Sequence, residues 1–241
     1  MNAIAGASFL ILCAALVRVA LREEPSTAPV FARAYTQSLA AEDIALIAST
    51  TDATSTTPLG DAILEQFVSR YATLAARGTD VNTIARSATD IVPRVPVSSH
   101  DPALIPTDAD TSLARVLTYR SELRDALAPL LNNTDPELDI YAQWIDTGDK
   151  KHLERLDAIA DDYEKAVTQA RILRVPADAV HLQAGILDAM SEFSLALRAL
   201  ARNAEDPIAS LTLLRTFNAA EEKMFTAFNA LGIYAASKTQ L

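Results

Sequence analysis

Apolar residues return at helical spacing throughout the last third of the chain. From Leu153 to Ala170 they recur every three or four positions, so they lie on one face of a helix. Two more such stripes follow. The three stripes consist of Leu153, Leu156, Ala160, Tyr163, Val167 and Ala170, then Leu182, Ile186, Met190, Phe193, Leu197 and Leu200, then Leu211, Leu214, Phe217, Met224, Phe228 and Leu231. Three amphipathic helices with short breaks between them must bury their stripes against one another, which predicts an antiparallel helical bundle.

Polar residues at helix starts support this pattern along the chain. Thr57 and Asp206 each stand before a proline, the arrangement of an N-cap followed by proline at the first helical position. Thr134 and Glu137 have the spacing of a capping box. Gly148 follows the helix that they open and is expected to end it. We therefore expect an all-α fold.

The domain organisation follows from where apolar runs and prolines fall. Residues 1–22 are predicted to be a transmembrane anchor, residues 23–35 a linker, and residues 36–241 a helical bundle domain. Within it, residues 91–110 form a Pro-rich loop, because four prolines exclude regular structure there: Pro93, Pro96, Pro102 and Pro106.

The anchor prediction rests on the run from Ala3 to Leu21, which is long enough to span a bilayer core. The alternative is a cleaved signal peptide, for which Ser26-Thr27-Ala28 offers a small-x-small site. Three arginines lie on the C-terminal side of the run (Arg18 within it, Arg22 and Arg33 after it), and by the positive-inside rule they favour a cytoplasmic domain.

Composition excludes several classes of function. The net charge is −10, which disfavours nucleic acid as a partner. The chain has only 6 glycines, none clustered, so neither a P-loop nor a dinucleotide-binding motif is present. The single cysteine, Cys13, lies in the N-terminal apolar run, so no disulfide and no cysteine metal site can form within the chain.

Several segments of the second half carry a family resemblance. Val175-Pro176, His181-Leu182 and Asp206-Pro207 occur in that order, and a Leu-rich run leads on to Phe228; the stretch from Leu153 to Tyr163 also fits. This pattern resembles a family of uncharacterised single-pass membrane-anchored α-helical proteins of small-genome bacteria. The resemblance implies a helical domain on the extracytoplasmic side and no assigned activity.

Two Asp-x-x-His spacings are the best candidates for a metal site. Asp149 with His152, and Asp178 with His181, each place a carboxylate and an imidazole on one helix face. Glu65 and Glu122 could complete a dinuclear site, although their spacing does not select them. The competing interpretation is that both aspartates serve in first helical turns, where carboxylates favour the helix dipole. We expect no metal and no other cofactor.

Two further groups stand out. His100 lies between hydroxyl and carboxylate residues on the Pro-rich loop, but neighbours in sequence rarely converge as a catalytic triad. Trp144 with Tyr141 would be an anchor for a partner protein if exposed.

The sequence as a whole favours a non-catalytic, membrane-anchored scaffold or accessory subunit of a cell-envelope assembly. Its expected partners are the membrane, through the N-terminal helix, and a protein or a second copy of the chain, with no nucleic acid. Two other functions remain open: a helical metal-binding protein or enzyme that uses the Asp-x-x-His pairs, and a sensory ligand-binding domain.

Overall fold

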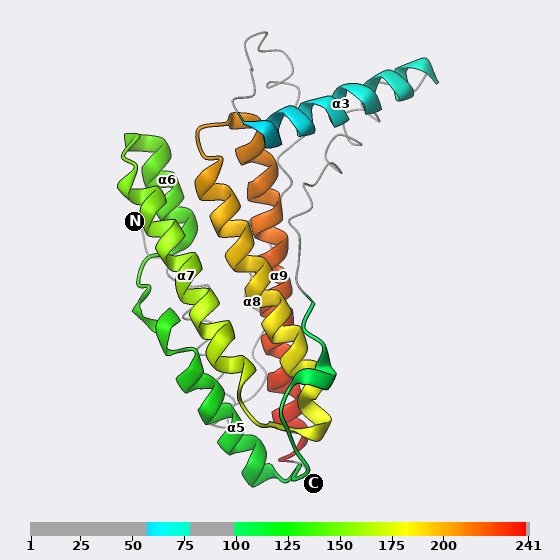
Figure 1. Cartoon of the computed structure of the whole chain (residues 1–241), viewed down its shortest axis with the longest axis vertical. Coiled ribbons are helices and arrows are strands. Elements are labelled where there is room, and N and C mark those ends of the chain that lie inside the picture. The colour runs from blue at the N-terminus through cyan, green and yellow to red at the C-terminus, as the bar shows by residue number, and fades with distance from the viewer. Residues whose placement is uncertain (1–56, 78–98, 240–241) are drawn as a thin grey trace, which may run out of the picture. The chain divides into compact units, whose positions relative to one another are not determined.

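The computed structural model describes residues 57–77 and 99–239, and six α-helices dominate them (Figure 1). The first range holds α3 (Pro58–Ala76). The second holds, in order, η2 (Pro102–Leu104), β1 (Thr107–Asp108), α5 (Leu113–Ala126), η3 (Ala128–Asn132), α6 (Glu137–Thr147), α7 (Lys151–Arg171), β2 (Val175–Pro176), η4 (Ala177–Ala179), α8 (Val180–Arg202) and α9 (Pro207–Ser237). The expectation of an all-α fold is confirmed for these residues.

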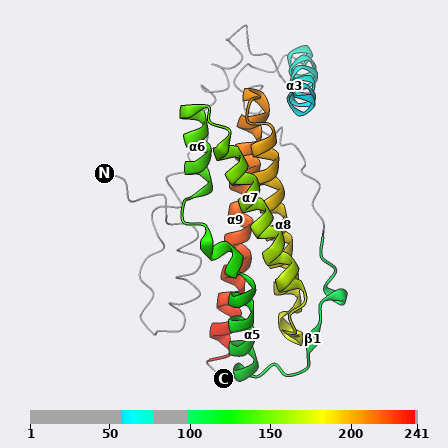
Figure 2. The same cartoon turned by 60° about the vertical axis from the view of Figure 1, so that its left-hand side comes forward.

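The described residues fall into two compact units. One comprises residues 99–202 and 217–239, and the other comprises 57–77 and 203–216. In the first unit α7 and α8 form an antiparallel pair, and α9 runs beside them (Figures 1 and 2). The shorter helices α5 and α6 follow one another along α7, joined by η3, and so take the place of a fourth helix. This arrangement confirms a helical bundle.

Aromatic rings fill the centre of this bundle. The ring centroid of Phe193 on α8 lies 4.9 Å from that of Tyr163 on α7 and 4.9 Å from that of Phe217 on α9. All three side chains are almost completely buried. The predicted core faces of α7 and α8 are therefore largely correct, with Leu153, Val167 and Leu182 only half-buried at their edges.

The third stripe is partly wrong. In α9, Leu213 is fully buried, whereas the predicted Leu211 and Leu214 are half-buried. The buried face here also includes Thr212 and Thr216, whose hydroxyl groups donate to the carbonyl oxygens four residues earlier. These bonds satisfy the hydroxyls within the helix, so threonine can occupy the buried face, and the spacing of apolar residues alone does not predict it.

Helix starts follow the predicted polar residues in the second unit. Asp206 accepts hydrogen bonds from the backbone N–H groups of Ile208 and Ala209 through one carboxylate oxygen, at 3.0 Å each. Its other oxygen accepts from the backbone N–H and the hydroxyl of Thr57, and the Thr57 hydroxyl in turn accepts from Gly60 N–H. One buried carboxylate thus caps α9 and holds the cap of α3.

Two local predictions need correction. The capping box does not form: α6 begins at Glu137 with Pro136 at its N-cap, so Thr134 is not the N-cap and Glu137 is the first helical residue instead of the third. The Glu137 carboxylate accepts from the Tyr163 hydroxyl. The Pro-rich loop is not devoid of regular structure, since η2 and the short parallel pair of β1 with β2 lie within or beside it. Proline suits the first position of η2, and Pro106 contributes the carbonyl that accepts from Val175 N–H.

The predicted anchor at residues 1–22 and the linker at 23–35 lie outside the described residues, as does part of the predicted bundle domain at 36–241. Among the helices that the structure describes, none is long and apolar enough to cross a membrane.

Candidate functional site

The two Asp-x-x-His pairs lie at opposite ends of the bundle. His152 is in the first turn of α7 and His181 is in the first turn of α8. Because these helices run antiparallel and α7 has 21 residues, their starts are separated by about 30 Å at 1.5 Å per residue. The structure therefore does not bring the two imidazoles together. Within the described ranges no group of three His, Cys, Asp or Glu side chains is placed to hold a metal ion.

The carboxylates of these pairs have other partners. Asp149 accepts from the backbone N–H of Lys151 at 3.1 Å and pairs with its ammonium group at 2.7 Å. Asp178 accepts from the Tyr234 hydroxyl and from the Lys238 ammonium group, both at 2.6 Å, and so ties the end of α9 to the start of α8. Partial burial works against ionisation of Asp178, but these two bonds lower its pKa below the ordinary value. Asp149 precedes α7 and Asp178 lies in η4, before α8, so neither is in the first turn of the helix that carries its histidine.

Neither Glu65 nor Glu122 belongs to a group of three potential metal ligands among the described residues. Glu122 pairs instead with Arg115, which lies two turns earlier on the same face of α5, at 3.2 Å. Arg115 also pairs with Asp108 at 3.0 Å and donates to the carbonyl of Arg174, so it holds α5 to both short strands.

His100 fastens the loop before α5 to α8. Its backbone N–H donates to an Asp188 carboxylate oxygen at 2.6 Å, and its ring Nδ1 lies 2.8 Å from the same oxygen. The neighbouring Asp101 accepts from Ala103 N–H and caps η2. The histidine and its neighbouring carboxylate therefore act on different partners, and this stretch forms a clasp rather than a triad.

A shallow depression of about 500 Å³ lies beside this clasp. Asp101, Ile105 and Thr107 line one side, and Val180 and His181 line the other. His181 is the one candidate metal ligand that lines it. The His181 imidazole and the Asp101 carboxylate lie there among mostly apolar neighbours, and no hydrogen bond positions His181 as a base.

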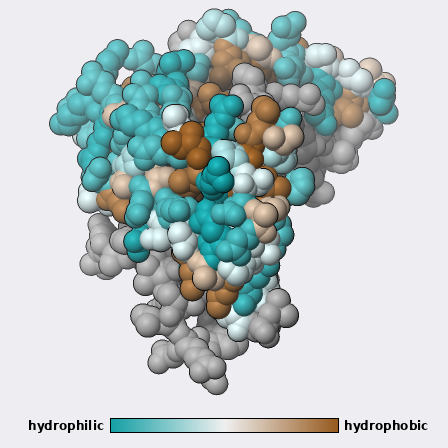
Figure 3. Space-filling model, turned by 60° about the horizontal axis from the view of Figure 1, so that its bottom comes forward, coloured by the Kyte–Doolittle hydropathy of each residue, from teal (hydrophilic) through white to brown (hydrophobic). Residues whose placement is uncertain are grey.

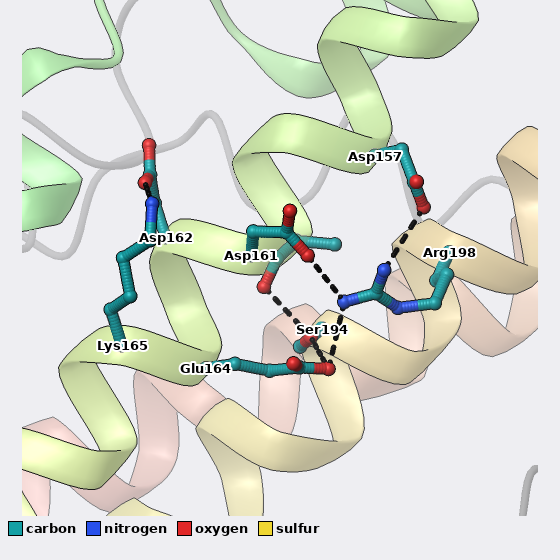
Figure 4. A network of polar contacts seen from close by, with 8 residues as sticks. Asp157, Asp161, Asp162, Glu164, Lys165, Ser194 and Arg198 are labelled. Atoms are coloured by element: carbon teal, nitrogen blue, oxygen red, sulfur yellow. Dashed lines mark hydrogen bonds and ion pairs between the residues drawn. The ribbon is translucent and has the colours of Figure 1, made fainter.

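The largest ionic network among the described residues joins α7 to α8 (Figure 4). Arg198 on α8 pairs with three carboxylates on α7: Asp157 at 3.2 Å, Asp161 at 2.8 Å and Glu164 at 2.8 Å. The hydrogen bond to Asp161 raises the pKa of Arg198 despite the opposing effect of burial, and Glu164 raises it further. Beneath this network, Ser194 donates to the carbonyl of Ala160 at 3.0 Å. The network joins two helices and leaves an excess of negative charge.

A buried polar chain joins α5 to α8 and to the end of α7. The Tyr119 hydroxyl donates to the side-chain oxygen of Gln183, whose NH₂ group donates to the carbonyl of Ala170 at 2.8 Å. Both side chains are fully buried. Burial raises the pKa of Tyr119 further above its ordinary value, at which the hydroxyl is already protonated and able to donate at neutral pH. Each group has a partner, which is the arrangement of a structural network.

Negative charge also gathers where α6 meets α7 and α9. Burial raises the pKa of Glu137 above its ordinary 4.5, and the charge of Glu221 on α9 raises it further. The hydrogen bond that Glu137 accepts from the Tyr163 hydroxyl, at 3.3 Å, acts in the opposite direction. The α6 end of the bundle thus holds carboxylates that repel one another.

Large apolar side chains remain on the surface of several helices. They include Leu113 and Leu117 on α5, Ile145 on α6, and Phe225 and Ile233 on α9, and Ile172 follows α7 directly. Figure 3 shows hydrophobic residues as separate patches among hydrophilic ones at the end of the molecule that it faces. Trp144 is half-buried, with its ring centroid 5.6 Å from that of Tyr141, so it meets the condition for a partner anchor only in part.

Comparisons with known proteins give no family. No family model, no curated protein and no solved structure matches the chain. The resemblance to single-pass membrane-anchored proteins stays a prediction from the sequence.

Proposed function

We propose that this protein is a non-catalytic helical scaffold or accessory subunit, anchored in a membrane by residues 1–22, that binds a protein partner through exposed helix faces. The observation that supports binding is the set of large exposed apolar side chains, which includes Ile145 at 61%, Ile233 at 63% and Ile172 at 74% exposed. Single exposed apolar residues are normal on a protein surface, so a binding face also needs suitable neighbours around its apolar side chains.

The bundle interior supports the non-catalytic part of the proposal. Its largest buried side chains are aromatic and aliphatic, and the buried polar groups Tyr119, Gln183 and Ser194 each bond within the bundle. The separation of His152 from His181 removes the geometric basis for a shared metal site between them.

Photo-crosslinking tests the binding function. A photoreactive residue is placed in the full-length chain at Ile145, Ile172 or Ile233, one position at a time, and irradiated in intact cells. A discrete adduct from at least one position, reproduced in purified membranes, is expected. Absence of any adduct at all three positions, with each variant expressed in the membrane fraction, would refute a binding role through these faces.

Two further measurements address the anchor and the rival function. Deletion of residues 1–22 is expected to release the protein from the membrane fraction, and protease added to spheroplasts is expected to digest the domain, because we place it on the extracytoplasmic side. Metal analysis of the purified full-length protein tests the rival function. Stoichiometric iron, manganese or zinc that is lost on His181→Ala would contradict the scaffold function and favour a metal-binding one.

A further inference from the structure

One face of α6, on which Ala142, Ile145 and Asp146 are exposed and Leu138 and Asp139 are half-buried, combines an apolar ridge with an acidic ridge. Leu138, Ala142 and Ile145 follow one another at intervals of four and three residues, so they lie on one line along the helix. Asp139 and Asp146, seven residues apart, form a second line beside it. Helix α6 buries Ile140 and Tyr141 on its other side against the bundle.

Charge distinguishes this face from the other exposed apolar positions. Residues 135–164 contain ten acidic and three basic side chains, a difference of −7 in a chain whose total is −10. The other two exposed isoleucines lack acidic neighbours of this kind. Ile172 lies between Arg171 and Arg174 in the sequence, and Ile233 has the uncharged Asn229 and Ser237 one turn away on its helix face. The effects of Glu221 on Glu137, and of three carboxylates on Arg198, indicate the same excess of negative charge around α6 and α7.

We propose that the α6 face, formed by Leu138, Asp139, Ala142, Ile145 and Asp146, docks a cationic amphipathic segment of a partner protein. This inference rests on the proposed function, because it names the surface and the partner chemistry of that binding role. The apolar ridge accepts the apolar side of the segment, and the acidic ridge pairs with its Lys or Arg side chains. An anionic membrane surface and nucleic acid are repelled by the same charge.

Helix α6 also carries a residue whose fluorescence can be used to measure binding. Trp144 is the only tryptophan of the chain, and it is adjacent to Ile145 and half-buried beside Tyr141. A partner that covers Ile145 changes the surroundings of this indole, so tryptophan emission from the full-length protein reports on this one face.

The test is a titration of the detergent-solubilised full-length protein with a helix-forming peptide of leucine and lysine, about 18 residues long so that it can form several turns. A saturable change in Trp144 emission that weakens as salt is raised is expected. Ile145→Lys is expected to weaken binding by about tenfold or more, as for a central apolar contact. Asp139→Asn combined with Asp146→Asn is expected to weaken it and to reduce its salt dependence.

Matched controls separate this face from general attraction to an acidic protein. Ile233→Lys changes an equally exposed isoleucine by the same charge and is expected to leave binding unchanged. A peptide with glutamate in place of lysine is expected not to bind. Each variant is first checked for unchanged helical circular dichroism, above all the one that replaces Asp139, because that side chain is half-buried whereas Ile145, Asp146 and Ile233 are exposed.

Three results would overturn the inference: no emission change with the lysine peptide, equal weakening by Ile145→Lys and Ile233→Lys, or self-association of the full-length protein that Ile145→Lys abolishes. The last would make a second copy the occupant. A failed titration together with photo-crosslinks from Ile172 or Ile233 would reject this surface and leave the proposed function standing, whereas the absence of all crosslinks would reject both.

Discussion

Helices α8 and α6 belong to the same unit of the bundle and differ in what they leave at the surface. Helix α8 buries eleven residues, and its polar side chains Gln183, Ser194 and Arg198 all bond to α7 or to its end. Helix α6 buries only Ile140 and Tyr141 and leaves an isoleucine exposed beside aspartates. The difference shows that stability is concentrated along α8, so the surface of α6 can change with little cost to the fold.

The largest effect is expected at the aromatic centre of α8. Phe193→Ala leaves a cavity between Tyr163 and Phe217 and should lower the free energy of unfolding by about 3–5 kcal/mol. Urea unfolding followed by circular dichroism measures it. Phe225→Ala, at an exposed position of α9, is the control and should cost less than about 1 kcal/mol. Equal costs for the two variants would show that the aromatic cluster is not the centre of the core.

The second-largest loss of stability is expected from breaking the buried hydrogen bonds between Tyr119, Gln183 and the Ala170 carbonyl. Gln183→Leu removes the partner of the Tyr119 hydroxyl and of the Ala170 carbonyl, and leaving them unbonded should cost about 1–3 kcal/mol. Gln143→Leu, at an exposed position of α6, should change stability by less than about 0.5 kcal/mol. The comparison of α8 with α6 fails if the α6 variant is the more damaging of the two.

The ionic seam should contribute less and should depend on salt. Arg198 is 16% exposed and faces three carboxylates, so Arg198→Met should cost about 1–2 kcal/mol at low ionic strength, with a smaller difference from wild type in 1 M salt. Lys165→Met removes only the exposed pair with Asp162 and should cost about 0.5 kcal/mol or less. A cost that is unaffected by salt would indicate lost packing rather than lost charge pairing.

The smallest effect is expected on the pH dependence of stability and comes from Glu137, at the start of α6. The pKa of Glu137 is raised in the folded protein, so folding favours the protonated form. Its contribution to stability is present below the ordinary value of 4.5 and is lost as pH rises through the folded-state pKa. Glu137→Gln should therefore reduce the loss of stability between pH 4 and neutral pH, an effect measured by thermal unfolding across that range.

Asp178 provides the opposite control. Its pKa is lowered in the folded protein, so its contribution is present above the ordinary value and is lost as pH falls through the folded-state pKa. Asp178→Asn should reduce the loss of stability in acid and leave the slope above pH 4.5 unchanged. Identical pH profiles for the two variants would contradict the assigned directions.

The sequence was sufficient for the regular parts of the fold and not for the polar contacts between them. Helical spacing located Phe193 and Leu197 in the core, and proline after Asp206 located the start of α9. The bonds of Arg198, His100 and Gln183 join residues between 13 and 88 positions apart, and such pairings have no periodic signal in a single chain.

Of the candidate sites, the sequence predicted the α6 face only in part and placed the Asp-x-x-His pairs wrongly. The sequence predicts Trp144 as a possible partner anchor, because it is the single tryptophan and lies near Tyr141. The exposure of Ile145 could not be predicted in this way, because it depends on which side of α6 meets α7. The Asp-x-x-His spacings were local regularities, and the antiparallel course of α7 and α8 separated them.

Hydrogen–deuterium exchange of the full-length protein, with and without the leucine–lysine peptide, tests most directly whether α8 supports the fold while α6 meets the partner. The account predicts slow exchange in α8 under both conditions and new protection confined to α6 and the adjoining start of α7. New protection in α8 or α9 with no change in α6 would contradict it.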